Sequence, residues 1–358
     1  MRRALKIIGA IVGLLLVALA GLAIYIYSTA IEPSRPVGFQ RLAIADPGHS
    51  PIAAAVWYPT NAKPGFMFLG TGGLRVATDA PVEGNRLPLI VFSHGTAGSA
   101  GSHADTAIAL AEKGFIVIAP THPGDTFQAA GDVETWLVNR SRHVARTIDA
   151  ALTTWKDREH VDPERIGIFG FSAGATTALI SIGGKPDLSR IWSQCSSQPE
   201  FVCQTTSPQA YRNPGPTAWQ RDGRISAAVL AAPGLGFTFA PAGLSDVKVP
   251  VKLWAGSDDE TVPPATNARL LHNLLGQRAE LHVVPGAVHF SFLMPCGLLG
   301  PRELCQDPNG FDRPAFHRQF NSEVVRFFET KLGHATAAPK KLGGASRLMA
   351  KIGSEPAI

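Results

Sequence analysis

A serine at position 172 lies among small residues, in the stretch 170–174 that reads Gly-Phe-Ser-Ala-Gly. A short apolar run predicts a strand over 165–171, and the small residues that follow predict a helix over 173–182. A serine on a sharp turn between a strand and a helix is typical of a catalytic nucleophile, because the strained backbone there tolerates only small neighbours. The N-terminal end of the helix would stabilise negative charge that develops beside it. We therefore expect Ser172 to be a nucleophile.

A serine hydroxyl is a weak nucleophile at neutral pH, so it needs a general base, and the base needs an acid to orient it. The strand expected at 251–255 is followed by the sequence Gly-Ser-Asp-Asp-Glu-Thr-Val-Pro. Two adjacent aspartates are candidates for the acid. Asp259 begins the arrangement Asp-x-x-Val-Pro and is preferred, which would leave Asp258 as a solvated loop or cap residue.

His289 follows the strand expected at 280–284 and is the preferred base among eleven histidines. It completes the chain order serine, acid, histidine. His122 also follows an expected strand and is the rival base. It precedes Ser172, which is the wrong order, so we expect it to line the pocket or to be structural.

The developing oxyanion needs backbone N–H donors. One is expected from Ala173, the residue after the nucleophile, and the other from the loop after the strand expected at 89–92. Residues 94–98 of that loop read His-Gly-Thr-Ala-Gly, whose glycines allow the backbone to approach a substrate. We assign the second donor to Thr96 and expect His94 to organise the loop.

The elements that must position these groups alternate along the chain. Strands are expected at 39–45, 52–58, 89–92, 115–119, 165–171, 225–231, 251–255 and 280–284, and helices at 104–113, 136–155, 173–182, 265–275 and 316–331. Strands of continuous apolarity indicate burial on both faces, as in a parallel sheet between helices. The alternation predicts a doubly wound, mostly parallel α/β sheet with helices on both faces and the active-site loops at the carboxyl ends of the strands.

Three stretches interrupt or extend this domain, which is expected over 39–332. Residues 60–88 are rich in glycine and proline and predict a long surface loop. Residues 183–224 have low periodicity but contain four tryptophan, tyrosine and phenylalanine residues. We expect them to form a lid or pocket wall, since long loops are usually functional, and a floppy surface insertion is the alternative. Residues 333–358 predict a flexible tail.

The N-terminal residues 1–30 set the compartment. Three basic residues precede an uncharged run at 7–27, which is long enough to span a bilayer and long for a signal peptide. Tyr25 and Tyr27 would anchor it at the interface. We expect a signal anchor in the inner membrane, or alternatively a cleaved signal peptide, with the remaining chain outside that membrane. A proline-punctuated linker is expected at 31–38.

The four cysteines agree with an exported domain. Pairing the cysteines by closeness joins Cys195 to Cys203 and Cys296 to Cys305, although three pairings are formally possible. Hydrophobic residues make up 45% of the chain, which suits a large core. Part of the net charge of +5 lies at the two ends of the chain. Without those basic residues the body is near neutral, which argues against a nucleic-acid partner.

Four motifs in order resemble the bacterial α/β-hydrolases known as predicted dienelactone hydrolases, which are related to platelet-activating-factor acetylhydrolases. They are Val-Phe-Ser-His-Gly, Gly-Phe-Ser-Ala-Gly, Ala-Gly-Ser-Asp-Asp-Glu-Thr-Val-Pro-Pro and Ala-Val-His-Phe-Ser-Phe. The resemblance covers about residues 56–331. It implies an α/β-hydrolase fold, a triad of Ser172, Asp259 and His289, oxyanion donors at Thr96 and Ala173, and no metal or cofactor.

True dienelactone hydrolases resemble this fold but carry a cysteine nucleophile, so Ser172 favours ordinary carboxylic-ester hydrolysis. A membrane anchor would keep the site near lipids. We therefore expect a short-acyl or lipophilic small-molecule or lipid ester as substrate, with acetylated or oxidised phospholipids included. Acyl transfer by the same triad is one alternative. A non-catalytic binding protein on this fold is another, but none of the three triad positions is broken.

Overall fold

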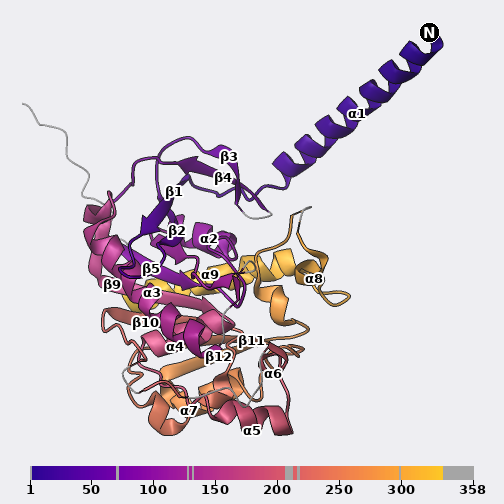
Figure 1. Cartoon of the computed structure of the whole chain (residues 1–358). Helices are drawn as coiled ribbons and strands as arrows, with labels where there is room; N and C mark the ends of the chain where they lie inside the picture. The colour runs from indigo at the N-terminus through magenta and orange to yellow at the C-terminus, as the bar shows by residue number, and fades with distance from the viewer. Residues whose placement is uncertain are drawn as a thin grey trace, which may run out of the picture.

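The computed structural model describes residues 2–69, 72–126, 129–130, 133–205, 213–215, 218–297 and 300–333. One ten-stranded sheet crosses the domain in the order β12-β11-β10-β9-β5-β6-β2-β1-β4-β3 (Figure 1). Its strands are β1 (Val37–Ile44), β2 (Ile52–Pro59), β3 (Gly65–Leu69), β4 (Gly72–Thr78), β5 (Leu87–Ser93), β6 (Ile116–Pro120), β9 (Val161–Phe171), β10 (Ile225–Ala231), β11 (Val251–Gly256) and β12 (Ala279–Val284). A separate two-stranded ribbon joins β7 (Asp125–Thr126) to β8 (Ala129–Ala130).

The centre of the sheet is parallel. Strands β12, β11, β10, β9, β5 and β6 run in the same direction. Strand β2 is antiparallel to β6 and to β1, while β4 pairs parallel with β1 and antiparallel with β3. Every residue of β5 is buried, as expected for a strand with helices on both sides.

Helices cover both faces of the sheet, which confirms the doubly wound prediction. One face packs against α3 (Val133–Thr153), α4 (Ala173–Ser181) and α7 (Ala268–Leu275), and the other against α2 (Ala104–Ala111) and α9 (Arg313–Leu332). Successive strand residues point to opposite faces, so Ile168 joins the first core and Phe169 the second. Burial of each large apolar side chain contributes about 1.5–3 kcal/mol to folding.

The prediction of a long surface loop at 60–88 is wrong, because this stretch contains the hairpin β3–β4. Leu74 and Val76 are buried on one side of β4, and β4 extends the sheet beside β1. Gly73 allows the close pairing, since a Cβ there would lie 2.8 Å from the ring of Phe66. The glycine and proline content of the stretch concealed this alternation of apolar side chains.

Helix α1 (Arg2–Ser28) projects away from the domain in Figure 1. Its segment Leu5–Ser28 is long and apolar enough to cross a membrane, a property that a signal sequence shares. After α1, Ile31 donates to the carbonyl of Gly73 and accepts from the N–H of Arg75, each at 2.9 Å. The first residue of the expected linker is thus hydrogen-bonded to the edge of the sheet, and the last two residues of that linker belong to β1. The expected tail lies outside the described residues except for Gly333.

Candidate active site

Ser172 lies between the last residue of β9 and the first of α4. Its backbone has φ 55° and ψ −121°, a conformation that costs a non-glycine residue about 1–3 kcal/mol. The neighbouring glycines have no room for a side chain. A Cβ on Gly170 would lie 2.2 Å from the carbonyl oxygen of Gly174, and one on Gly174 would lie 1.9 Å from that of Ser93. Only residues without a side chain at these two positions therefore permit the sharp turn that presents the Ser172 hydroxyl.

The structure brings together three side chains that are distant in the sequence. His289 Nε2 lies 3.0 Å from Ser172 Oγ, and His289 Nδ1 lies 2.8 Å from Asp259 Oδ2. Asp259 follows β11 and His289 follows β12, so all three residues lie beyond the carboxyl ends of parallel strands. With Nδ1–H donating to the carboxylate, Nε2 is left to accept the proton of the serine hydroxyl. This is the geometry of a nucleophile, a base and an orienting acid.

Asp259, rather than the adjacent Asp258, contacts the histidine. Asp259 is 3% exposed, and its Oδ1 accepts the backbone N–H groups of Thr261 at 3.0 Å and Val262 at 2.9 Å. Asp258 is exposed and accepts the hydroxyl of Ser257 at 2.6 Å. The geometry therefore favours Asp259 as the acid, the same residue that the Asp-x-x-Val-Pro pattern indicated.

The loop after β5 passes beside the nucleophile. A Cβ on Gly95 would lie 3.2 Å from Ser172 Cβ. Thr96 is exposed, while the N–H of Ala97 donates to Asp125 Oδ1 at 2.9 Å and is not available to a substrate. Ala173 is the first residue of α4, where backbone N–H groups have no partner within the helix.

Arg140 organises this loop, although the sequence analysis did not single it out. The side chain is fully buried, pairs with Asp125 at 2.7 Å and donates to the carbonyl oxygens of His94 and Gly95. Because C=O and N–H point in opposite directions in a trans peptide, this contact turns the Thr96 N–H away from Arg140. Burial lowers the pKa of Arg140, and the charge and hydrogen bond of Asp125 oppose that effect.

The sequence did contain a signal for Arg140. Leu137, Arg140, Val144 and Ile148 are spaced as one face of a helix, and all four are buried. A buried arginine within an apolar stripe needs a buried partner for its charge, so this pattern predicts such a partner. The identity of that partner, Asp125, could not be read from the pattern.

His94 and His122 are buried side chains that hold the loops. His94 Nδ1 donates to the carbonyl of Gly95 at 2.7 Å, and its Nε2 accepts the N–H of His122 at 3.0 Å. His122 Nε2 lies 2.9 Å from the hydroxyl of Ser93. Burial and then the Arg140 charge hold the pKa of both imidazoles well below the usual value, so both are neutral. His122 thus has a structural role, and His94 organises its loop.

A second Asp–His pair supports the segment that carries His289. His317 Nδ1 lies 2.6 Å from Asp105 Oδ2, and His317 Nε2 lies 2.9 Å from the carbonyl oxygen of Ser291. Asn321 donates to the same carboxylate oxygen at 2.9 Å. The pair joins α2 to α9 and holds the backbone two residues after His289. Helical periodicity predicts both helices but does not show that these two residues face each other.

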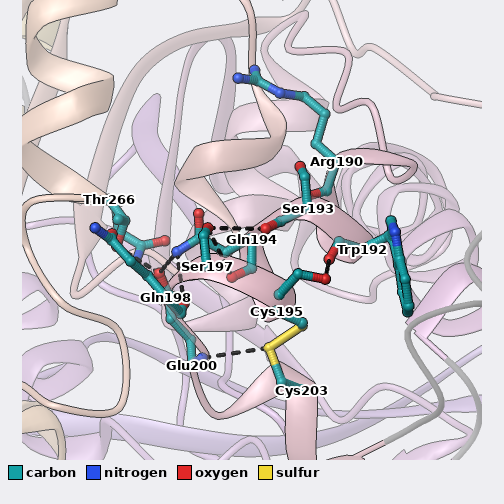
Figure 2. Close-up of a disulfide and its surroundings, with 12 residues drawn as sticks. Arg190, Trp192, Ser193, Gln194, Cys195, Ser197, Gln198, Glu200, Cys203 and Thr266 are labelled. Atoms are coloured by element: carbon teal, nitrogen blue, oxygen red, sulfur yellow. Dashed lines mark hydrogen bonds between the residues drawn. A yellow bond between two sulfur atoms is a disulfide. The ribbon is translucent and has the colours of Figure 1, made fainter.

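The segment 183–224 is described in part and contains α5 (Arg190–Ser197) and α6 (Val202–Thr205). Figure 2 shows the Cys195–Cys203 disulfide that joins them, with Gln194, Glu200 and Thr266 converging nearby. Glu200 accepts from Thr266 at 2.5 Å and from Asn267 at 2.9 Å. Burial, aided by the Asp259 charge, raises the pKa of Glu200. This segment therefore packs against the residues that follow the Asp259 loop.

A second disulfide, Cys296–Cys305, encloses α8 (Arg302–Cys305). Both pairings that closeness suggested are therefore formed, and the described residues contain no free cysteine. The second bond lies in the segment after His289. Arg313 links this segment to α9, because it donates to the carbonyl of Leu304 at 2.8 Å and to Asp307 at 2.7 Å.

Comparison with known proteins supports the same architecture. A ferulic acid esterase from Streptomyces cinnamoneus has a similar structure, with 18% sequence identity and a TM-score of 0.60 over 88% of this chain and 96% of that chain. The chain has the α/β-hydrolase fold. The sequence profile of the dienelactone hydrolase family matches residues 74–193, about a third of this chain, including Ser172. No curated protein matches it. The family match and the esterase neighbour support a carboxylic ester hydrolase.

Proposed function

We propose that the protein hydrolyses carboxylic esters with Ser172 as nucleophile, His289 as base and Asp259 as acid. The observation that carries the proposal is the continuous hydrogen-bonded chain from Ser172 Oγ through the imidazole to the Asp259 carboxylate, at 3.0 and 2.8 Å. Both His289 and Asp259 are buried, which strengthens their interaction relative to water.

In the first half of the reaction, Ser172 Oγ attacks the ester carbonyl carbon and His289 Nε2 takes the hydroxyl proton. The N–H groups of Thr96 and Ala173 hold the resulting oxyanion, and each such donor contributes about 2.7–4 kcal/mol to transition-state stabilisation. His289 then returns the proton to the alkoxide leaving group, which departs as an alcohol. In the second half, His289 deprotonates a water molecule that attacks the acyl-enzyme, and the acid is released with Ser172 restored.

We place the protein at the membrane as a single catalytic domain at 39–332 behind an anchor at 1–30, with 183–224 as a pocket wall. The apolar α1 and the two disulfides support an extracytoplasmic domain. The substrate class proposed is a short-acyl or lipophilic ester, phospholipid-type esters included. Proximity of the site to lipids supports this class.

The test is hydrolysis of p-nitrophenyl butyrate by the full chain and by the variant Ser172→Ala. We expect the substitution to lower kcat by about 10⁴-fold or more, because the acyl-enzyme cannot form. Ser245→Ala is the matched control, since Ser245 is exposed and its hydroxyl donates to the backbone carbonyl of Ala242. A fluorophosphonate probe should label the parent and not the Ser172 variant. Equal turnover by parent and Ser172→Ala would refute the assignment.

A further inference from the structure

Exposed aromatic side chains gather at two places outside α1. Among the described residues beyond that helix, the large hydrophobic side chains that are exposed are Phe66, Phe68, Trp192 and Phe201. The first two lie on β3, next to the end of α1, and the other two belong to the segment of α5 and α6, which Figure 1 shows away from β3. An edge strand with exposed aromatic residues is a surface that proteins usually cover.

The end of α1 is fixed to this edge of the sheet. The ring of Tyr27 contacts the ring of Phe66 at a centroid distance of 5.8 Å, and the Arg75 guanidinium lies 4.1 Å from the Tyr27 ring. Arg75 also pairs with Glu32 at 2.7 Å. Together with the backbone bonds of Ile31, these contacts fix the direction of α1 relative to the hairpin. If α1 crosses a bilayer, the hairpin therefore lies at the level where the helix emerges.

A cavity opens between the same elements. Its volume is about 310 Å³, within the range of ligand sites, and its walls are largely apolar. The lining includes Ile26 from the last turn of α1, Thr29 directly after that helix, and Phe68 from β3. Met294 and Pro295, from the segment after His289, complete the wall. The wall thus continues from the end of α1 to the segment that follows His289.

We propose that β3 and the end of α1 form one lipid-contacting surface, in which Phe66 and Phe68 enter the interfacial region of the bilayer and lipid acyl chains cover the cavity. The inference rests on the anchoring in the proposed function. Continuity favours lipid over a protein partner, because the apolar surface of α1 leads into the cavity and Tyr27 has the interfacial position that such residues favour. This contact would hold the catalytic domain in one orientation on the membrane.

The test uses the full chain reconstituted in phosphatidylcholine vesicles whose acyl chains carry bromine, a contact quencher of tryptophan. Phe66→Trp and Phe68→Trp each add a tryptophan on β3, and Phe201→Trp is the matched control in the segment of α5 and α6. All variants carry the same six native tryptophans, and none of these lies in α1. We expect the fluorescence added at 66 and 68 to be quenched at least 2-fold by brominated lipid, and that added at 201 to be unaffected.

A tryptophan at 68 that is quenched no more than one at 201, in protein that floats with the vesicles, would overturn the proposal. Failure to float with the vesicles would also overturn it, since it removes the anchor. The quenching measurement is repeated with variants that also carry Ser172→Ala, because quenching does not depend on turnover. Failure of the ester-hydrolase proposal appears separately, as absent turnover of p-nitrophenyl butyrate by the parent.

Discussion

Two Asp–His pairs in this molecule have nearly the same geometry and different surroundings. In both, Nδ1 of a buried histidine lies close to a carboxylate oxygen, at 2.8 Å in Asp259–His289 and 2.6 Å in Asp105–His317. The difference is the group at Nε2. His289 faces the Ser172 hydroxyl, which can donate, whereas His317 faces the Ser291 carbonyl, which can only accept. His289 Nε2 can therefore accept a proton from its neighbour, whereas the Ser291 carbonyl offers His317 Nε2 no proton to accept.

The group that faces Nε2 thus decides whether an Asp–His pair can transfer a proton or only stabilises the structure. Burial alone would raise the pKa of Asp105, but the His317 charge and the hydrogen bonds from His317 and Asn321 outweigh it and hold this pKa below its usual value. A carboxylate beside an imidazolium is a stable ion pair. Through Ser291, this structural pair also fixes the segment that carries His289.

Among the residues of these two pairs, the largest expected effect comes from Asp259→Asn. The amide can donate to His289 Nδ1, which would place the imidazole proton on Nε2 and leave no acceptor for the Ser172 proton. We expect kcat for p-nitrophenyl butyrate to fall by about 10⁴-fold. The melting temperature should change little, and circular dichroism checks that the variant is folded. A variant that keeps more than a tenth of the parent kcat would contradict the role of Asp259.

The matched variant Asp105→Asn should show the opposite pattern. It leaves the buried His317 charge without its partner, so we expect the free energy of unfolding to fall by about 3–5 kcal/mol. Turnover of the folded fraction should fall by less than about 10-fold, because no group that contacts substrate is changed. Urea unfolding and kcat at 15 °C measure the two quantities. A large loss of turnover with unchanged stability would contradict the structural role of the Asp105–His317 pair.

Lowering the pH should destabilise the parent through histidines that fold in the neutral form. Burial lowers the pKa of His103, and burial followed by the Arg142 charge lowers that of His143, each to about 4. The unfolded chain binds these protons near pH 6.5, so the free energy of unfolding should decline as the pH falls from about 6.5 to 4. Urea unfolding across this range measures the decline, and His143→Gln should reduce its slope. An equal slope in the variant would exclude His143 as a source.

The smallest effect is expected from Asp258→Asn. This carboxylate is exposed and accepts a hydrogen bond from the hydroxyl of the neighbouring Ser257, so kcat should stay within about 2-fold and stability within about 0.5 kcal/mol. Steady-state kinetics beside Asp259→Asn gives the comparison directly. A loss of 100-fold or more at position 258 would mean that the acid had been assigned to the wrong aspartate.

The sequence predicted those features that local patterns encode. The turn at Ser172 follows from small residues between a strand and a helix, and the doubly wound sheet follows from buried strands that alternate with helices. The hairpin β3–β4 was missed because Gly73 and its neighbours resemble a loop in composition, while the pairing depends on β1. The partners of Arg140 and His317 were also missed. Periodicity shows which face of a helix is buried, but not which residue of another helix or loop meets it.

The backbone at Ser172 sets stability against the proposed chemistry. Its positive φ suits glycine better than any residue with a side chain, so Ser172→Gly would relieve local strain and yield a more durable but inert molecule. Folding and activity thus make opposite demands on one position. A glycine at position 172 would thus exchange the hydroxyl of the proposed nucleophile for a more relaxed backbone.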